Sequence, residues 1–424
     1  MAERFDVLIA GAGPAGLAAA QAVGLHGARA AVIDAQAAAG GQVWRRDVLR
    51  PRPFSARKAI ARAFADGVDF FPQTQIVAAS ADELLLEGAD GASILRYGRL
   101  VIATGARELL LPFPGWTLPG VTGAGGLQAL VKQGWPIAER RVVVAGSGPL
   151  LLAAAASLRR HGAQVLGVYE QASARSVRAF AAALVRWPAR AIQAVGLRAA
   201  LAGVPYHCGA FVRAAHGDAQ LQSLEIETPL GLRRIDCEYL AVGFGLVPNI
   251  ELAQLVGCRL DASRRHPCIA VDEQRRTSVP NVYAAGEVCG IGGCDAARID
   301  GAIAGYGAVG AVQAAQRLQP AGRRARNFAA LLQQHFALDD RIRTLSLPDT
   351  LICRCEDVPM AALEGFADSR AAKLATRCGM GACQGRICGA ALAELDRFAA
   401  ASARAPLFPA RLSTFTDSIT ATPT

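Results

Sequence analysis

The sequence predicts an α/β fold in which two β-α-β modules are followed by a small helical domain near the C-terminal end. The first module begins with a buried strand at residues 5–10, passes through a glycine turn at 11–16 and enters an Ala-rich helix at 17–26. The second module repeats this order from residue 141, with its own glycine turn at 146–149. Five of the eleven cysteines lie between residues 353 and 388, which sets the C-terminal part apart from both modules.

Further strands complete each module. Strands at 30–34 and 164–170 close the two β-α-β units, and a helix at 150–160 fills the second one. Short strand-and-glycine patterns at 100–105 and 240–245 can return the chain from one module to the other, and a Pro- and Gly-rich stretch suits the crossing. The second module is therefore expected as an insertion within the first.

The other segments carry less chemistry. The Ala- and Arg-rich stretch 171–215, interrupted by Pro188, is expected to be helical, and helical spacing at 360–366 and 390–398 predicts a small domain around the cysteines. The last dozen residues, rich in Ser and Thr, are expected to be flexible or bound by a partner. The predicted domains are 1–118 and 246–330 for the two parts of the first module, 119–245 for the second, 331–345 for a linker, 346–398 for the cysteine domain and 399–424 for the tail.

Composition and charge exclude several classes of protein. The formal net charge is +10, but the arginines are scattered and lysine occurs only at Lys58, Lys132 and Lys373, so no basic groove for nucleic acid is predicted. The first residues leave no room for a signal peptide, and the uncharged run 142–158 contains Gly and Pro, so no membrane span is expected. We therefore expect a cytoplasmic protein whose cysteines serve metal or redox chemistry and form no disulfide framework.

The glycine turn of the first module fits the dinucleotide-binding pattern G-x-G-x-x-G. Gly11 permits the tight turn, Gly13 lets the backbone approach a pyrophosphate, and Gly16 packs the helix on the strand, while the helix N-terminus faces the phosphates. Asp34, at the end of the next strand, is placed to accept a hydrogen bond from an adenosine ribose. The residues expected at this cofactor are Gly11, Gly13, Pro14, Ala15, Gly16 and Asp34.

Three further segments point to FAD as this dinucleotide. Residues 277–287 resemble the second fingerprint of flavoproteins with two dinucleotide-binding domains, T-x6-A-x-G-D, with Glu287 in place of the usual Asp. In those proteins the carboxylate meets a hydroxyl of the ribityl chain, and a longer acid can still accept that bond. The loop 40–45 resembles a flavin-contact loop of the thioredoxin-reductase-like branch. The residues added to the expected FAD site are Gly41, Gln42, Arg45, Ala103, Thr104, Gly105, Gly286 and Glu287.

The second glycine turn departs from the pattern at one position. Gly146 and Gly148 match it, but Leu151 stands where Gly or Ala normally allows close helix packing. Glu170, at the end of the following strand, suits an unphosphorylated ribose and favours NAD over NADP. Two alternatives stay open: a working hydride-donor site for NAD, and a structural or vestigial site for an adenine nucleotide.

The cysteine segment combines one C-x-C pair with two overlapping C-x4-C pairs. Cys353 and Cys355 belong to every set of four thiolates, and Cys383 pairs with either Cys378 or Cys388. Four thiolates on a short, glycine-rich backbone can hold a [2Fe-2S] cluster, and a four-thiolate zinc site of structural role is the alternative. No C-x-x-C or C-x4-C pair occurs near the first glycine turn or in the second module, so disulfide reductase chemistry is not expected.

The remaining cysteines are expected to be small buried hydrophobes. Cys289 and Cys294, close to the flavin fingerprint, are the one pair among them that could be considered as ligands. The full set is Cys208, Cys237, Cys258, Cys268, Cys289 and Cys294.

Over almost its whole length the sequence resembles the α-type subunits of the flavin-dependent opine oxidase, D-hydroxyproline dehydrogenase and hydrogen cyanide synthase family. The resemblance rests on the first glycine turn, on residues 40–45 and 286–293, and above all on the cysteine segment with its T-R-x-G-M-G-x-C-Q-G-R-x-C pattern. It implies a BFD-like [2Fe-2S] domain whose ligands are Cys353, Cys355, Cys383 and Cys388, and it leaves Cys378 as an extra thiol.

The same resemblance implies partners and a role. In that family a separate β subunit, similar to D-amino-acid oxidases, oxidises the C–N bond of the substrate, and the α subunit relays electrons to an acceptor such as a respiratory carrier. A small γ subunit, an FMN at a subunit interface and peripheral association with the inner membrane are left open.

No Ser/His/Asp set and no pair of catalytic acids emerges from the sequence, so no catalytic residue is assigned to this chain. The resemblance implies that the expected function is electron relay within a heteromeric amino-acid or opine dehydrogenase. Two alternatives remain: a stand-alone NAD(P)H-dependent FAD and iron–sulfur reductase, and a non-catalytic assembly subunit with structural nucleotide and metal.

Overall fold

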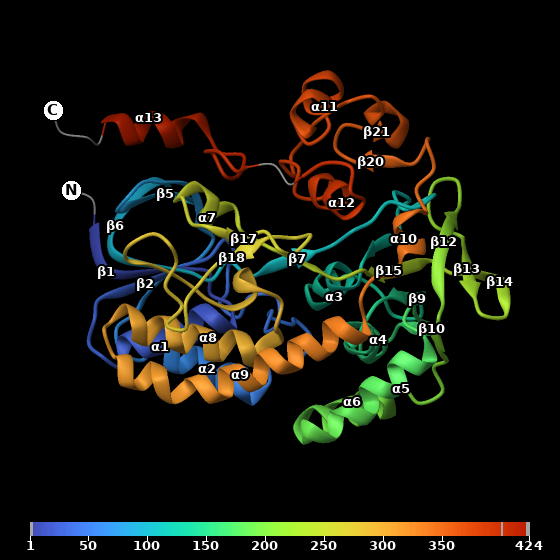
Figure 1. Cartoon of the computed structure of the whole chain (residues 1–424), viewed down its shortest axis with the longest axis horizontal. Coiled ribbons are helices and arrows are strands. Elements are labelled where there is room, and N and C mark those ends of the chain that lie inside the picture. The colour runs from blue at the N-terminus through green and yellow to red at the C-terminus, as the bar shows by residue number, and fades with distance from the viewer. Residues whose placement is uncertain (1–2, 400–401, 421–424) are drawn as a thin grey trace. The chain divides into compact units, whose positions relative to one another are not determined.

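The computed structural model describes residues 3–399 and 402–420 and divides the chain into two compact units. Unit 1 comprises Met1–Arg107, Val247–Ala329 and Ser402–Thr424, and unit 2 comprises Glu108–Leu246 and Ala330–Ala401. The chain passes from one unit to the other within β7 (Ala106–Glu108), β16 (Leu246–Pro248) and α9 (Val312–His335). An insertion of one β-α-β module within another thus gives each unit its own sheet (Figure 1).

The sheet of unit 1 has the order β3-β2-β1-β6-β5-β4, and β19 pairs with β6. β1, β2, β3, β6 and β19 run parallel, so their carboxyl ends lie at one edge of the sheet, where ligands bind in open α/β folds. β4 and β5 are antiparallel. The strands are β1 (Glu3–Ala10), β2 (Ala30–Ile33), β3 (Asp69–Phe71), β4 (Gln75–Ala79), β5 (Glu83–Gly88), β6 (Gly91–Ile102) and β19 (Val282–Ala284).

Helices α1 (Pro14–Gly24) and α8 (Gly293–Ala308) pack against each other at backbone distance (Figure 1). A Cβ atom at Gly301 would lie 2.0 Å from the carbonyl oxygen of Ala15, and one at Gly305 would lie 2.5 Å from that of Ala19. Glycine at these two positions therefore allows the backbones of the two helices to lie this close together. The other elements of unit 1 are α2 (Phe54–Ala63), α7 (Glu251–Leu255), α13 (Leu412–Thr420), the 3-10 turn η2 (Gly286–Cys289) and the pair β17 (Leu260–Asp261) and β18 (Cys268–Ile269).

The main sheet of unit 2 is fully parallel, in the order β11-β10-β9-β15-β8. Near-continuous apolar strands form it because both of its faces are buried. A second, antiparallel sheet has the order β12-β13-β14. The strands of the two sheets are β8 (Val121–Gly123), β9 (Arg141–Gly146), β10 (Gln164–Glu170), β11 (Tyr206–Cys208), β12 (Phe211–His216), β13 (Ser223–Thr228), β14 (Gly231–Asp236) and β15 (Tyr239–Gly243). The helices beside them are α3 (Ala124–Lys132), α4 (Leu150–Arg160), α5 (Ala174–Ala183), the 3-10 turn η1 (Leu184–Arg186) and α6 (Pro188–Ala200).

The predicted fold class is confirmed, and one local prediction within it is wrong. α5, η1 and α6 fill the first part of the stretch expected to be helical, and Pro188 is the first residue of α6, a position that needs no N–H. From residue 206 onward the chain forms β11 and β12 instead. β12 pairs with β13 and buries Phe211, Val212 and Ala215, so tertiary pairing outweighs the helical composition.

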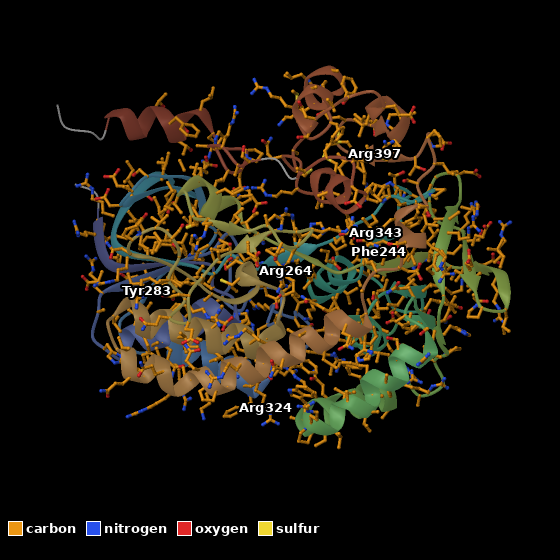
Figure 2. The ribbon with its side chains drawn as sticks, in the orientation of Figure 1. Phe244, Arg264, Tyr283, Arg324, Arg343 and Arg397 are labelled. Carbon is orange, nitrogen blue, oxygen red and sulfur yellow. The ribbon has the colours of Figure 1, made fainter. Side chains whose placement is uncertain are left out.

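The cysteine segment of unit 2 is held by short elements. They are α10 (Asp340–Arg343), β20 (Leu351–Cys353), β21 (Val358–Pro359), η3 (Met360–Leu363), α11 (Ser369–Thr376) and α12 (Cys388–Glu394). Trp116 donates through Nε1 to the carbonyl oxygen of Leu351 at 2.6 Å. Arg343, labelled in Figure 2, bonds through Nε and Nη2 to Oε1 of the buried Glu394 at 2.9 and 2.8 Å. These contacts fix the segment within unit 2.

The C-terminal tail, expected to be flexible or bound by a partner, has contacts with the rest of unit 1 in its described part. Its described residues pack on unit 1: Leu407 donates its N–H to the carbonyl oxygen of Val77 at 2.8 Å, and the buried Thr414 bonds to Glu87 through its hydroxyl. Thr414 lies in α13 and bonds within the chain itself, and whether the last dozen residues are flexible or bound by a partner stays a prediction. Residues 421–424 lie outside the described part.

Candidate functional site

The first glycine turn leaves a gap in front of α1. Gly11 has a φ of 110° and turns the chain directly after β1, and a Cβ at Gly16 would lie 1.8 Å from the carbonyl oxygen of Gly11. A Cβ at Gly13, the residue before α1, would meet no described atom within 4 Å. The N-terminus of α1 therefore opens onto free space, as binding of a pyrophosphate requires.

Asp34 is fixed beside this turn by backbone donors. Its Oδ2 accepts the N–H of Ala12 at 2.7 Å, and its Oδ1 accepts the N–H of Gln36 at 2.8 Å. An ionised carboxylate has about four lone-pair sites, so both oxygens can accept a further bond from a ribose hydroxyl. The position fits the role predicted for Asp34.

The loop that carries Gly41, Gln42 and Arg45 lies against the first glycine turn. A Cβ at Gly41 would lie 2.9 Å from the Cα of Gly13. Arg45 donates through Nε and Nη2 to Oε1 of Gln42 at 3.2 and 2.7 Å. Partial burial lowers the pKa of Arg45, and the nearby charge of Asp34 opposes this effect. These three residues therefore gather beside the turn.

The remaining predicted flavin residues reach the same edge of the sheet from β6 and β19. Ala103 follows β6 and donates its N–H to the carbonyl oxygen of Ala10 at 2.9 Å, and Thr104 bonds through its hydroxyl to the carbonyl oxygen of Asn249 at 2.7 Å. Gly286 has a φ of 80°, and a Cβ there would lie 2.8 Å from the Cβ of Ala15. A Cβ at Gly105, another predicted flavin residue on this edge, would meet no described atom within 4 Å.

Glu287 supplies an acceptor that the described residues leave without a partner. Its Oε1 accepts the N–H of Gly293 at 2.7 Å, but its Oε2 is buried with no hydrogen-bond partner in the described part of the chain. Burial raises the pKa of this carboxyl group. A buried oxygen in this state calls for a donor from a ligand, and a hydroxyl group of FAD fits that need.

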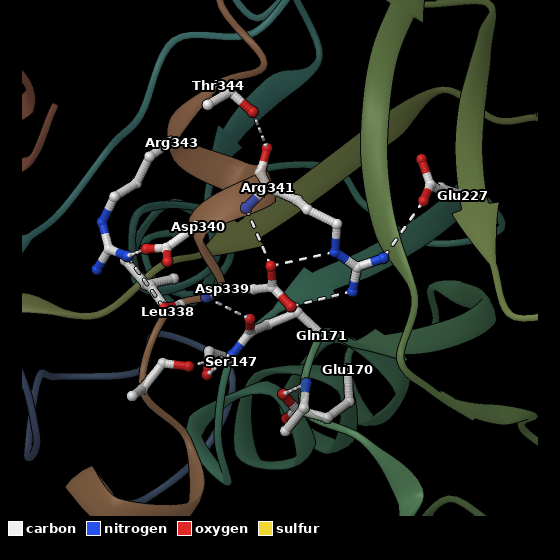
Figure 3. Close-up of polar contacts among 12 residues, drawn as sticks. Ser147, Glu170, Gln171, Glu227, Leu338, Asp339, Asp340, Arg341, Arg343 and Thr344 are labelled. Atoms are coloured by element: carbon white, nitrogen blue, oxygen red, sulfur yellow. Dashed lines mark hydrogen bonds and ion pairs between the residues drawn. The ribbon is translucent and has the colours of Figure 1, made fainter.

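The second glycine turn has different surroundings. A Cβ at Gly148 would lie 3.7 Å from both Cβ and Cγ of Phe336, so the residue expected to approach a pyrophosphate already faces a side chain. Glu170, labelled in Figure 3, is fully buried, and it accepts the N–H groups of Gly148 and Ala172 at 2.7 and 2.9 Å. Burial raises the pKa of Glu170 to about 7, and the bonds from Ala172 and Gly148 limit the rise.

Leu151, which departs from the dinucleotide-binding pattern, packs against a glycine that leaves space for its side chain. It is fully buried at the start of α4, and a Cβ at Gly243 would lie 2.9 Å from its Cδ2. The glycine at the end of β15 thus makes room for the larger side chain on α4. Leu151 is accommodated without displacing the helix from the sheet.

All five cysteines of the C-terminal segment lie in one cluster. The sulfur atoms of Cys353, Cys378 and Cys388 are buried and lie within 4.8 Å of one another. Cys383 hydrogen-bonds to Cys388 and Cys355, and the bond to Cys388 raises the pKa of Cys383 to about 12. Such a set of thiols fits a [2Fe-2S] cluster or a zinc ion by donor type.

The glycine-rich turn between α11 and α12 makes this cluster possible. A Cβ at Gly381 would lie 2.1 Å from the Cβ of Cys355, so only glycine lets the turn approach the C-x-C pair. Cys355 is exposed and Cys383 is half-buried, whereas the extra thiol Cys378 belongs to the buried trio. The predicted ligands Cys353, Cys355, Cys383 and Cys388 are therefore brought together with Cys378 beside them.

The other cysteines take no part in a comparable cluster. Three of them, Cys237, Cys258 and Cys268, are buried, and the other three, Cys208, Cys289 and Cys294, are half-buried. Within the described ranges, the C-terminal trio is the one group of three or more His, Cys, Asp or Glu side chains with metal-ligand spacing. The contacts of Ser147 and Gln171 with residues near Phe336 were not foreseen, because no motif links positions so far apart in the chain.

Comparisons with known proteins place these features in a family. Residues 5–317 match the family described as pyridine nucleotide-disulphide oxidoreductase. The chain is 32% identical to the HcnB subunit of hydrogen cyanide synthase from Pseudomonas protegens, with 91% of this chain and 90% of that protein covered. It is also 32% identical to the A-type subunit of opine oxidase from Rhizobium meliloti strain 1021, with 92% of both chains covered.

Solved structures show the same fold at lower sequence identity. The L-proline dehydrogenase from P. horikoshii is 20% identical, with a TM-score of 0.66 over 98% of this chain and 80% of that chain. The T. acidophilum thioredoxin reductase is 21% identical, with a TM-score of 0.55 over 73% of this chain and 99% of that chain.

The family implies FAD binding, in agreement with the gap at Gly13 and the unpartnered oxygen of Glu287. Over the described part of the chain, no helix combines the length and the apolar character needed to cross a membrane. The chain therefore belongs to the pyridine nucleotide-disulphide oxidoreductase family of flavin-dependent oxidoreductases, in the group that includes the HcnB subunit of hydrogen cyanide synthase and the A-type subunit of opine oxidase.

Proposed function

We propose that this chain is the electron-relay subunit of a heteromeric amino-acid or opine dehydrogenase and carries FAD and one [2Fe-2S] cluster. The observation that carries the proposal is the cluster of five thiols, three of them buried with sulfur atoms within 4.8 Å, in a chain that also has a flavin-type glycine turn. The relatives named as subunits of opine oxidase and of hydrogen cyanide synthase support a subunit role.

Different residues of unit 1 would bind different parts of FAD. The N–H groups at the start of α1 face the pyrophosphate, Asp34 accepts from the ribose of the adenosine half, and Oε2 of Glu287 accepts from a hydroxyl of the flavin half. When bound, FAD exchanges electrons in pairs or singly, and a two-iron cluster exchanges them singly. Burial around Glu287 keeps water away from the bond that it makes.

In unit 2 the proposed ligands are Cys353, Cys355, Cys383 and Cys388, with Cys378 as a fifth, non-ligating thiol. β20 and the turn after it present the first two, Cys383 lies in the turn before α12, and Cys388 is the first residue of that helix. The nearby Glu356 accepts a bond from Nε of Arg377 at 2.6 Å, which links the residue after Cys355 with the residue before Cys378.

The proposal assigns oxidation of the substrate C–N bond to a partner. That partner is a β subunit similar to D-amino-acid oxidases, and the electrons leave this chain to an acceptor such as a respiratory carrier. A small γ subunit, an FMN at the subunit interface and a peripheral position at the inner membrane extend the same proposal. The substrate is an amino acid or an opine.

Metal and flavin analysis of cysteine variants tests the proposal. The wild-type chain is expected to hold about one FAD and about two iron atoms with their sulfides. Cys383→Ser should lose the iron and keep the flavin, whereas the control Cys378→Ser, a neighbouring thiol of the same cluster, should keep both. Zinc without iron in the wild-type chain would refute the relay role, and loss of iron in Cys378→Ser would refute the assigned ligand set.

A further inference from the structure

The second glycine turn is covered by a segment of the same chain, residues 336–339, directly after α9. The ring of Phe336 lies against Gly148, and Oγ of Ser147 donates to the carbonyl oxygen of Phe336 at 2.7 Å. Phe180 packs against the same ring in a T-shaped contact, with 5.0 Å between the ring centroids and an interplanar angle of 74°. At the matching position of the first module, Gly13 has no described neighbour within 4 Å of its Cβ position. One turn is therefore open and the other is filled.

Gln171 connects residues 336–339 to the second glycine turn through hydrogen bonds. Its Nε2 donates to Oγ of Ser147 at 2.9 Å and to the carbonyl oxygen of Ala337 at 2.8 Å, and its Oε1 accepts the N–H of Asp339 at 2.8 Å (Figure 3). The side chain is buried, and each of its donors and its acceptor is used. A nucleotide at this turn would have to break these bonds and leave buried polar groups without partners.

The N–H group that would meet a phosphate is also occupied. Gly148 donates it to Oε2 of Glu170, and the full burial of Glu170 keeps this carboxylate away from any ribose in solution. The turn thus satisfies its own hydrogen-bonding groups.

The covering segment continues into the cysteine domain. After Asp339 the chain enters α10, where Arg341 bonds to Asp339 and lies 3.4 Å from Glu227 on β13 (Figure 3). Arg343, at the end of α10, holds Glu394 on α12, the helix that begins with Cys388. A continuous series of contacts within unit 2 therefore runs from the glycine turn to the thiol cluster.

We propose that the second glycine turn is a binding site for the chain's own residues 336–339 and takes no dinucleotide, and that it anchors the cysteine domain. The site uses the surface of a nucleotide module as an attachment point for α10 and α12. NADH then has no entry to this chain, and electrons must arrive from another donor. The inference stands on contacts within unit 2, and it does not depend on whether flavin or iron is bound.

Equilibrium dialysis and hydrogen exchange on the full-length chain test the proposal. With FAD in excess to fill the first module, the wild-type chain should take up neither NADH nor ADP below about 1 mM. The double variant Gln171→Ala/Phe336→Gly removes three hydrogen bonds and the ring, so exchange in peptides covering 336–339 should rise by roughly tenfold or more, and saturable ADP uptake should appear. The control Gln193→Ala, which removes an exposed Gln of α6 that bonds to Arg190, should change neither result.

Saturable uptake of NADH or ADP by the wild-type chain at micromolar concentration would overturn the proposal. So would a folded double variant with rapid exchange at 336–339 that still takes up no ADP, because the segment would then not be what excludes the nucleotide. If the double variant does not fold, dialysis of the wild-type chain is by itself the test of the proposal. Failure of the proposed relay function would show as missing iron, which leaves this measurement unchanged.

Discussion

Individual residues of the two glycine turns have different physical roles even where the pattern is the same. Gly16 is needed because any side chain would collide with the carbonyl oxygen of Gly11, whereas Gly13 faces open space. Gly148 holds the position of Gly13 in the second module, yet Phe336 fills the space in front of it. The backbone at these matched positions also differs, with a φ of −75° at Gly13 and of 89° at Gly148, so the shared glycines do not make the two turns equivalent as ligand sites.

The contrast between Gly13 and Gly16 gives a direct prediction. Gly13→Ala should leave the melting temperature of the flavin-free chain unchanged, because the new Cβ meets no described atom within 4 Å. It should weaken FAD binding roughly tenfold or more, because the methyl group occupies the approach of the pyrophosphate. Fluorescence titration of the flavin-free chain measures the affinity.

Gly16→Ala serves as the comparison for this experiment. Its Cβ would lie 1.8 Å from the carbonyl oxygen of Gly11, so this variant should lose about 1 to 3 kcal/mol of folding free energy through overpacking. Unchanged FAD affinity in a stable Gly13→Ala chain would place the flavin elsewhere.

Glu170 predicts a pH dependence of stability. Burial raises its pKa to about 7 from an ordinary value of 4.5, so between these values the folded chain binds more protons than the unfolded chain. The stability that Glu170 contributes is full below 4.5 and is lost as the pH rises through about 7. Between about pH 5 and pH 8 the loss should be on the order of 2 to 3 kcal/mol.

Urea unfolding of the wild-type chain and of Glu170→Gln at several pH values isolates this effect. As the pH rises, the unfolding free energy of the wild-type chain should fall relative to that of Glu170→Gln, because glutamine does not titrate. A difference that stays constant, or that shifts in favour of the wild-type chain, would show that the bonds from Gly148 and Ala172 outweigh the effect of burial.

At the scale of elements, local patterns could be predicted where residues close in sequence settle the structure. The helix at 150–160 and the strand at 164–170 were predicted with the bounds that α4 and β10 have. The helix expected to run to residue 215 failed where β12 pairs with β13, since that pairing depends on a hairpin beyond the stretch. Leu151 shows the same limit, because the glycine that accommodates it, Gly243, lies about ninety positions away.

The attachment of α12 to α10 yields a prediction at this scale. Arg343→Met should lower the unfolding free energy of unit 2 by about 3 kcal/mol, because it leaves the carboxylate of Glu394 buried without its main partner. Hydrogen exchange in α12 should rise accordingly. Arg397→Met, which removes an exposed arginine beyond the same helix, is the matched control (Figure 2).

A second variant separates loss of charge pairing from loss of packing. Arg343→Met/Glu394→Met removes both charges and should recover most of the lost stability, because no buried charge is left unpaired. If the double variant is less stable than Arg343→Met alone, the ion pair is not what attaches α12.

For the whole molecule, the sequence was sufficient to predict the two modules and the concentration of thiols, because each depends on motifs within a few tens of residues. The thiol cluster includes Cys378, which spacing alone could not place, and its burial depends on how the turn at Gly381 meets Cys355. The closure of the second glycine turn could not be predicted, since Ser147 and Phe336 are 189 positions apart and belong to no shared motif. In the proposed function, the turn that remains open is the one that binds a dinucleotide.

The measurement that tests the relay role most directly is an anaerobic titration of the purified chain, followed by absorbance and EPR, with NADH added first and dithionite second. The expected result is that NADH leaves the flavin absorbance unchanged, and that dithionite bleaches the flavin and produces the rhombic signal of a reduced two-iron cluster. Stoichiometric bleaching by NADH would contradict the relay role in favour of a stand-alone reductase. Absence of any cluster signal from a chain that contains zinc would contradict the relay itself.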